Sequence, residues 1–185
     1  MKHVFGFMTI LLLSGCIGGR TPEASFYTFA PRGDVVPVSE MNRTIDVARV
    51  RVAEYIDRPQ MVTVDGTHVN IAQDHRWVAG LGQITGGRVI SNLAQVFPNA
   101  VVKDSNFGSV GDCNVLIELR ELNGNLGSGV RMDALYTIAC GEYTKTRRID
   151  YVMPVGDSYS DYARIVGDMV DQMSDQIARD LVAAQ

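Results

Sequence analysis

The sequence has few of the residues on which metal centres depend, and it lacks a basic patch. Its 185 residues include only three cysteines and three histidines, so thiolate and imidazole ligands are scarce. It contains no run of lysine or arginine, and 17 basic residues stand against 21 acidic ones. Binding to a phosphate backbone requires clustered positive charge. We therefore expect no metal ion, no cofactor and no nucleic acid partner.

Motifs for common catalytic chemistries are also missing. The chain has no G-x-S-x-G, P-loop or H-E-x-x-H string. The glycines at 80, 82 and 86 resemble a dinucleotide loop, but the third comes one residue late. His68 and His75 are more typical of surface or helix-cap positions than of a general base, and no carboxylate pair is singled out by its spacing. The sequence predicts a protein that is not an enzyme.

The first residues have the pattern of an export signal. Lys2 precedes an uncharged apolar run from Val4 to Leu13, which as a helix would span about 15 Å, half of a bilayer core. It is too short for a transmembrane anchor and fits a signal peptide at residues 1–15. The string Leu-Ser-Gly-Cys ending at Cys16 resembles the bacterial lipobox, so we expect Cys16 to be acylated. The alternative is an ordinary signal peptide with an incidental cysteine.

The residues after Cys16 predict a tethered globular domain. Residues 16–24 are small, polar or helix-breaking and read as a flexible tether. Residues 25–185 are long enough for one domain. The whole sequence has 46% hydrophobic and 21% charged residues, which is typical of a globular protein. Ile17 rather than Asp follows the cysteine, which by resemblance to enterobacterial lipoproteins implies the outer membrane. We expect a lipid-anchored protein on its periplasmic face.

The first half of the domain predicts strands and one helix. Residues 26–29 and 44–52 have strand composition, and runs at 61–64 and 68–71 flank Asp65-Gly66, which is typical of a hairpin. Asp74 is placed to cap a helix over 75–97. Four glycines in its first half predict a late start, a break or close packing on a sheet. Residues 100–103 form a further strand candidate.

The second half predicts a β-meander followed by a long helix. Residues 113–123, 131–143 and 144–153 read as strands, and Asp157 or Ser158 can cap a helix that runs to the C-terminus. Its apolar residues recur at spacings of three and four, the stripe of an amphipathic helix. The fold class expected is α+β, with a single, mostly antiparallel sheet and two helices packed on one face.

Two cysteines are predicted to face each other. In a hairpin centred near residue 127, opposed positions have numbers that sum to about 254, and those of Cys113 and Cys140 sum to 253. An export signal implies an oxidising compartment, where a disulfide between them would persist. The alternative is a pair of buried, reduced cysteines.

Several strings resemble one known family. They are Phe26-Tyr27-Thr28-Phe29, the segment from Val52 to Val62 that contains Tyr-Ile-Asp-Arg-Pro-Gln, the pair Arg76-Trp77 opening a helix, and the long terminal helix. Together they resemble the ABC-type transport auxiliary lipoprotein family over nearly the whole mature chain. The resemblance implies a non-enzymatic periplasmic lipoprotein that works with an MCE-domain protein and a membrane permease to move lipids between membranes. The glycines of the first helix and the two cysteines depart from the family pattern.

The same strings supply candidate partner-binding residues. Association of the chain with copies of itself, as a homo-oligomer, is a further possibility. The candidates are Tyr55, Asp57, Arg58, Pro59, Gln60, Arg76 and Trp77. For residues 55–60 the alternative is a conformationally demanding turn with no contact role. For Trp77, a core anchor is favoured over an interface residue. The alternative function is an envelope assembly or stress lipoprotein that binds an outer-membrane protein or peptidoglycan.

Overall fold

The computed structural model describes residues 23–38 and 40–184. Its elements, in chain order, are β1 (Ser25–Tyr27), β2 (Thr44–Val47), β3 (Arg51–Val52), β4 (Gln60–Asp65), β5 (His68–Trp77), α1 (Leu81–Val96), β6 (Val101–Asp104), β7 (Cys113–Asn125), β8 (Gly129–Cys140), β9 (Tyr143–Pro154) and α2 (Tyr159–Val182). The expected signal peptide, Cys16 and the tether up to residue 22 lie outside the described residues.

The strands form two sheets, so the expectation of a single sheet is wrong. The larger has six strands in the order β6-β2-β7-β8-β9, with β3 also paired to β7, and the smaller has the order β1-β5-β4. After β3 the chain turns through residues 53–59, and β4 then pairs with β5 instead of extending the larger ladder. The sheets are also less antiparallel than expected, because β2 pairs in parallel with both β6 and β7.

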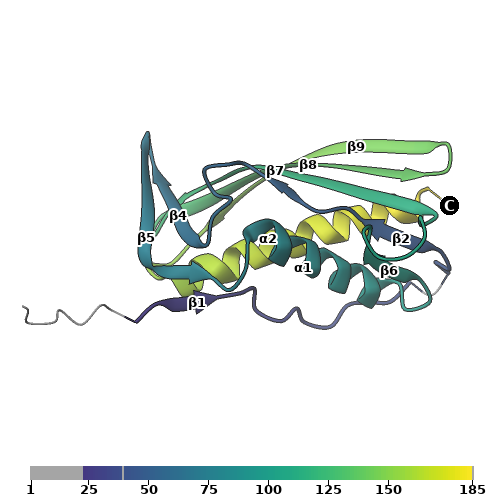
Figure 1. The fold of residues 1–185 in the computed structure, drawn as a ribbon, viewed down its shortest axis with the longest axis horizontal. Helices are drawn as coiled ribbons and strands as arrows, with labels where there is room; N and C mark the ends of the chain where they lie inside the picture. Colours follow the sequence, from purple (N-terminus) through teal and green to yellow (C-terminus); the bar gives the residue numbers. More distant parts are fainter. Residues whose placement is uncertain (1–22, 39, 185) are drawn as a thin grey trace, which may run out of the picture.

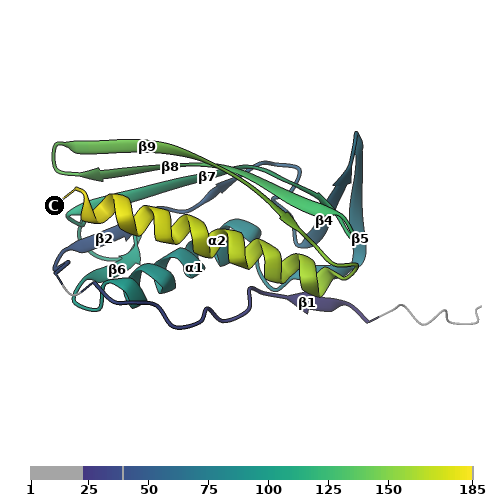
Figure 2. The ribbon, with the colours of Figure 1, turned by 180° about the vertical axis from the view of Figure 1, so that it is seen from behind.

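The predicted meander is confirmed, and both helices lie on one face of it. Strands β7, β8 and β9 pair antiparallel along nearly their whole length. Both α1 and α2 lie under the six-stranded sheet, and α2 runs along almost the full length of the molecule (Figures 1 and 2). The β4–β5 hairpin stands at one end beside β1, while β2 and β6 lie at the other.

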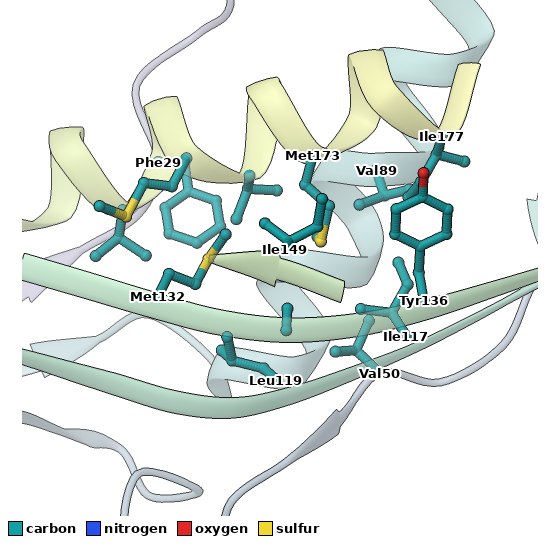
Figure 3. Packing of buried hydrophobic residues seen from close by; sticks show 14 of the residues in the cluster. Phe29, Val50, Val89, Ile117, Leu119, Met132, Tyr136, Ile149, Met173 and Ile177 are labelled. Carbon is teal, nitrogen blue, oxygen red and sulfur yellow. The ribbon is translucent and has the colours of Figure 1, made fainter. Parts of the chain in front are cut away.

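The core lies between α2 and the larger sheet. Met173 and Ile177 lie on the side of α2 that faces the sheet, across the core from Ile117 and Ile149 (Figure 3). All seven apolar residues of the predicted stripe are buried, at 1% exposure or less: Tyr162, Val166, Met169, Val170, Met173, Ile177 and Leu181. Ser158 caps α2 by accepting a hydrogen bond from the Asp161 backbone, as the sequence predicts.

Helix α1 begins six residues later than the helix predicted from His75. Residues 75–77 instead pair in parallel with Ser25–Tyr27, so Arg76 and Trp77 end strand β5 and do not open a helix. The late start and close packing expected from the glycines are both present. A Cβ on Gly82 would lie 2.7 Å from the Val50 carbonyl oxygen, so the backbone of α1 can approach the sheet only with glycine there.

Cys113 and Cys140 end neighbouring strands of the meander. They are direct partners in the β7–β8 register. A disulfide joins them, with the two Cα atoms 4.2 Å apart and a separation of 27 residues in the chain. The bond ties together the ends of the two strands that lie farthest from their connecting turn.

A buried carboxylate fastens the end of α2 to β8 and β9. The Tyr136 hydroxyl donates to Asp180 at 2.6 Å, and Lys145 and Arg147 donate at 2.8 and 3.0 Å. The Asp180 side chain is only 5% exposed. Burial alone would raise the pKa of this carboxyl, but the hydrogen bonds from Arg147, Lys145 and Tyr136 outweigh it and hold the pKa well below its usual range.

The disulfide predicts a specific thiol count. Unfolded but unreduced protein from envelope membranes should show no reactive thiol at Cys113 or Cys140. Closing a loop of 27 residues stabilises a fold by roughly 3–4 kcal/mol in the chain-entropy model, so the Cys113→Ser, Cys140→Ser double variant should unfold at lower denaturant concentration. Two titratable thiols in the unfolded, unreduced protein would contradict the bond.

The Asp180 cluster predicts acid-sensitive stability. Asp180→Asn should lower the free energy of unfolding by about 1–3 kcal/mol at pH 7. The effect is no larger because Lys145 and Arg147 are partly exposed. The native state keeps Asp180 ionised where the unfolded chain binds a proton, so this stabilisation is present above the ordinary carboxyl pKa of about 4 and is lost as the pH falls below it.

Urea unfolding of wild type and Asp180→Asn at pH 7 and pH 3 measures both effects. Asp168→Asn, on the exposed side of α2, is the matched control and should change little. The difference in the free energy of unfolding between wild type and Asp180→Asn should be smaller at pH 3 than at pH 7. An equal difference in the free energy of unfolding at both pH values would show that the carboxylate charge does not stabilise the fold.

Candidate functional site

The turn at residues 53–59 and the end of β5 bring most of the candidate residues together. The backbone N–H groups of Ile56 and Asp57 both donate to the Ala53 carbonyl, which closes the turn. The Trp77 N–H donates to the Pro59 carbonyl at 2.7 Å. Gln60 is the register partner of Arg76. Two strings that are separate in the sequence thus form one surface.

Tyr55 positions this turn. Its hydroxyl donates to the Asn123 side-chain oxygen at 2.7 Å and accepts from the Leu122 backbone N–H at 3.1 Å, so it is held on β7. Burial is the main cause that raises the pKa of Tyr55. Because its polar atom is engaged within the chain, Tyr55 acts by fixing the turn.

Trp77 belongs to the core. Its side chain is 3% exposed, and its ring meets the Phe29 ring edge-on with centroids 5.8 Å apart. Phe29 in turn packs beside Gly167 of α2. Trp77 is therefore the core anchor that its position favoured, and it lies beneath the surface that a partner could touch.

The charged part of the site consists of Arg58 and Arg76. Both are half-buried, and the Nε atom of each is buried without a hydrogen-bond partner. Within residues 23–38 and 40–184, neither forms an ion pair with a carboxylate. A buried guanidinium N–H without an acceptor is costly. Carboxylate and phosphate groups are the acceptors that pair best with a guanidinium.

We call this surface the arginine surface. It comprises Asp57, Arg58, Pro59, Gln60 and Arg76. Asp57 and Pro59 are exposed, and Gln60 is half-buried. The surface carries two arginines that form no ion pair with any described residue. Its backbone is held by hydrogen bonds to β5 and, through Tyr55, to β7.

The described part of the chain contains no cluster of metal-ligating side chains. No group of three or more His, Cys, Asp or Glu residues among the described residues is placed to hold a metal ion. His75, expected at a helix start, lies on β5 and stacks on Tyr159 with ring centroids 4.2 Å apart. None of the helices in this part of the chain is long and apolar enough to cross a membrane.

One further feature was missed by sequence reasoning. Residues 32–38, between β1 and β2, line an open pocket of about 510 Å³ together with residues of α1 and α2. The segment has no periodicity that would mark it as an element. The only signal was its valine content, in Val35, Val36 and Val38 around Pro37.

The fold of this chain is similar to those of proteins with known crystal structures. An uncharacterized protein of known crystal structure has a TM-score of 0.72 at 20% identity, over 86% of this chain and 99% of that chain. A Xanthomonas campestris protein assigned to the DUF330 family has a TM-score of 0.65 at 12% identity, over 83% of this chain and 92% of that chain. At these identities the similarity shows the fold alone. No curated protein sequence matches the chain.

The family match covers both the domain and the arginine surface. The model of the ABC-type transport auxiliary lipoprotein component matches residues 27–178. This range runs from β1 to the last turns of α2 and includes most of the chain. The resemblance seen in the sequence strings is confirmed, and the chain belongs to the family of ABC-type transport auxiliary lipoprotein components.

Proposed function

We propose that this chain is a non-enzymatic docking subunit of an MCE-type lipid transport system. In this proposal it is anchored through an acylated Cys16 to the periplasmic face of the outer membrane, and it binds an MCE-domain protein that works with a membrane permease. The observation that carries the proposal is the pair Arg58 and Arg76, which form no ion pair within the described part of the chain, on a domain of the auxiliary lipoprotein family.

The chemistry of the arginine surface supports a protein partner with exposed carboxylates. Each guanidinium has planar donors that suit bidentate contact with a carboxylate. Arg residues in partly desolvated positions often dominate the energetics of an interface. Because the backbone around them is already fixed by Tyr55 and Trp77, little ordering would be required on binding.

The position of β1 supports docking close to the anchoring membrane. Eight residues lie between Cys16 and Ser25, and the nine Cα-to-Cα steps of an extended chain span at most about 32 Å. In the register of β1 with β5, Phe26 is the partner of Arg76. A tethered domain would therefore hold the arginine surface within a few tens of ångströms of the membrane, where the outer-membrane end of a bridging partner would meet it.

The first prediction from this proposal concerns Arg58. Arg58→Glu should leave folding and acylation intact, since the side chain forms no ion pair in the described chain, but it should repel an acidic partner. Co-purification with the MCE-domain protein should weaken by about tenfold or more, or about 1.4 kcal/mol. Complementation of an envelope-permeability defect should fail.

Arg120→Glu is the matched control. Arg120 is on β7, with a side chain 44% exposed and a long contact to Glu118, and its reversal should leave the complex intact. Circular dichroism and pull-down are measured on the same samples. Loss of fold in Arg58→Glu would make the turn purely structural. Full complementation with an intact complex would refute docking, and capture of a barrel or cell-wall component instead would favour the alternative function.

The second prediction concerns the anchor. Mass spectrometry of the membrane-extracted protein should find an N-terminal peptide that begins at Cys16 and carries a diacylglyceryl group. Cys16→Ala should accumulate unprocessed precursor, because the acylated cysteine is what the expected processing requires. An unmodified N-terminus downstream of Cys16 would rule out the anchor, and fractionation with the inner membrane would rule out the outer-membrane assignment.

A further inference from the structure

The pocket of about 510 Å³ lies between the segment 32–38, here called the strap, and the two helices. From β1 the chain follows the length of the molecule toward the end where β2 and β6 lie (Figure 2). The pocket is lined there by Val96 at the end of α1 and by residues of the last two turns of α2. It is thus at the opposite end of α2 from β1. Its volume falls in the range of small-molecule sites.

The strap is fastened at both ends. At one end, an Arg32 guanidinium nitrogen donates to the Asp175 carboxylate on α2 at 2.5 Å. At the other, the Val38 backbone N–H donates to the Val96 carbonyl at 2.6 Å. The residues between these two contacts supply one wall of the pocket, so the pocket is built by long-range contacts and not by a chance gap between side chains.

The pocket wall is mainly aliphatic. Its apolar residues are Val35, Val36, Val38, Val96, Ala178 and Val182. Val36 is 86% exposed and Val182 is 40% exposed. Val35 and Val38 are half-buried, whereas Val96 of α1 is buried. The exposed valines of the strap and of α2 around one hollow are a surface that hydrocarbon would cover favourably.

Charges of both signs share the same pocket and are incompletely paired. Arg32 Nη1 is buried and has no hydrogen-bond partner. Among the described residues, the Arg179 guanidinium donates only to the neutral Gln176 side chain, at 2.8 Å. Asp34 is exposed and forms no ion pair with any described residue. The wall therefore offers donors for an anion and, on the strap, an acceptor for a cation.

We propose that this pocket binds one zwitterionic phospholipid of the phosphatidylethanolamine type. Arg32 and Arg179 receive the phosphate, Asp34 receives the ammonium group, and the valines cover part of an acyl chain. A purely anionic lipid would satisfy the arginines but be repelled by Asp34, and an uncharged amphiphile would leave Arg32 Nη1 unpaired. The inference rests on the proposed role in lipid transport and adds to it that this subunit itself contacts the lipid.

The test uses full-length acylated protein in vesicles of digalactosyldiacylglycerol, an uncharged lipid with neither phosphate nor ammonium group. The vesicles contain a trace of phosphatidylethanolamine with a photoactivatable diazirine on its acyl chain. After illumination, labelled peptides are mapped by mass spectrometry. Label should concentrate on peptides that contain Val35–Val38 and Ala178–Val182. Val36→Asp should reduce that label by about fivefold or more, which corresponds to about 1 kcal/mol. Val152→Asp, at a valine 71% exposed on β9, is the matched control and should not.

A second arm tests the headgroup. The same diazirine chain on phosphatidylglycerol, which lacks the ammonium group, should label the pocket less than phosphatidylethanolamine does, and Asp34→Asn should remove that difference. Label confined to other surfaces, or equal loss in Val36→Asp and Val152→Asp, would overturn the pocket. Equal labelling by both headgroups would overturn the zwitterionic assignment. No MCE partner is present, so these outcomes are independent of whether the arginine surface docks one.

Discussion

The burial of the apolar stripe of α2 against the meander is the constraint on which the rest of the structure depends. Met173 and Ile177 are at most 1% exposed and face the long strands across the core. Neither partner could remain ordered alone, since the inner face of the sheet and the stripe of the helix would both be open to water. Asp180 closes the far end of this contact through Tyr136, Lys145 and Arg147.

The arginine surface and the pocket are both formed by loop segments that are fixed to the helices and strands. The turn that carries Arg58 is fastened to β7 by Tyr55 and to β5 through the Pro59–Trp77 backbone bond. The strap is fastened to α2 by Arg32 and to α1 by Val38. In both cases loop residues are fixed by the scaffold, so exposed charge and exposed valine can be presented without a large ordering cost on binding.

The features that could be predicted from the sequence are those set by residues close together in the chain. Helical spacing identified the α2 stripe, and hairpin arithmetic placed Cys113 opposite Cys140. The single sheet and the helix start at His75 were wrong, because residues 75–77 pair with β1, a contact between distant segments that no short window contains. For the site, the string Tyr55–Gln60 was found, but the burial of Trp77 and the pocket beneath Val35–Val38 follow from tertiary packing alone.

We propose that the arginine surface binds an MCE-domain protein. A photo-crosslinking amino acid placed at Pro59, an exposed residue of that surface, tests it most directly in cells. The account predicts a crosslink to the MCE-domain protein from position 59 and none from position 144, an exposed residue of β9. Crosslinks from position 144 but not from position 59, with the protein folded in both cases, would contradict it.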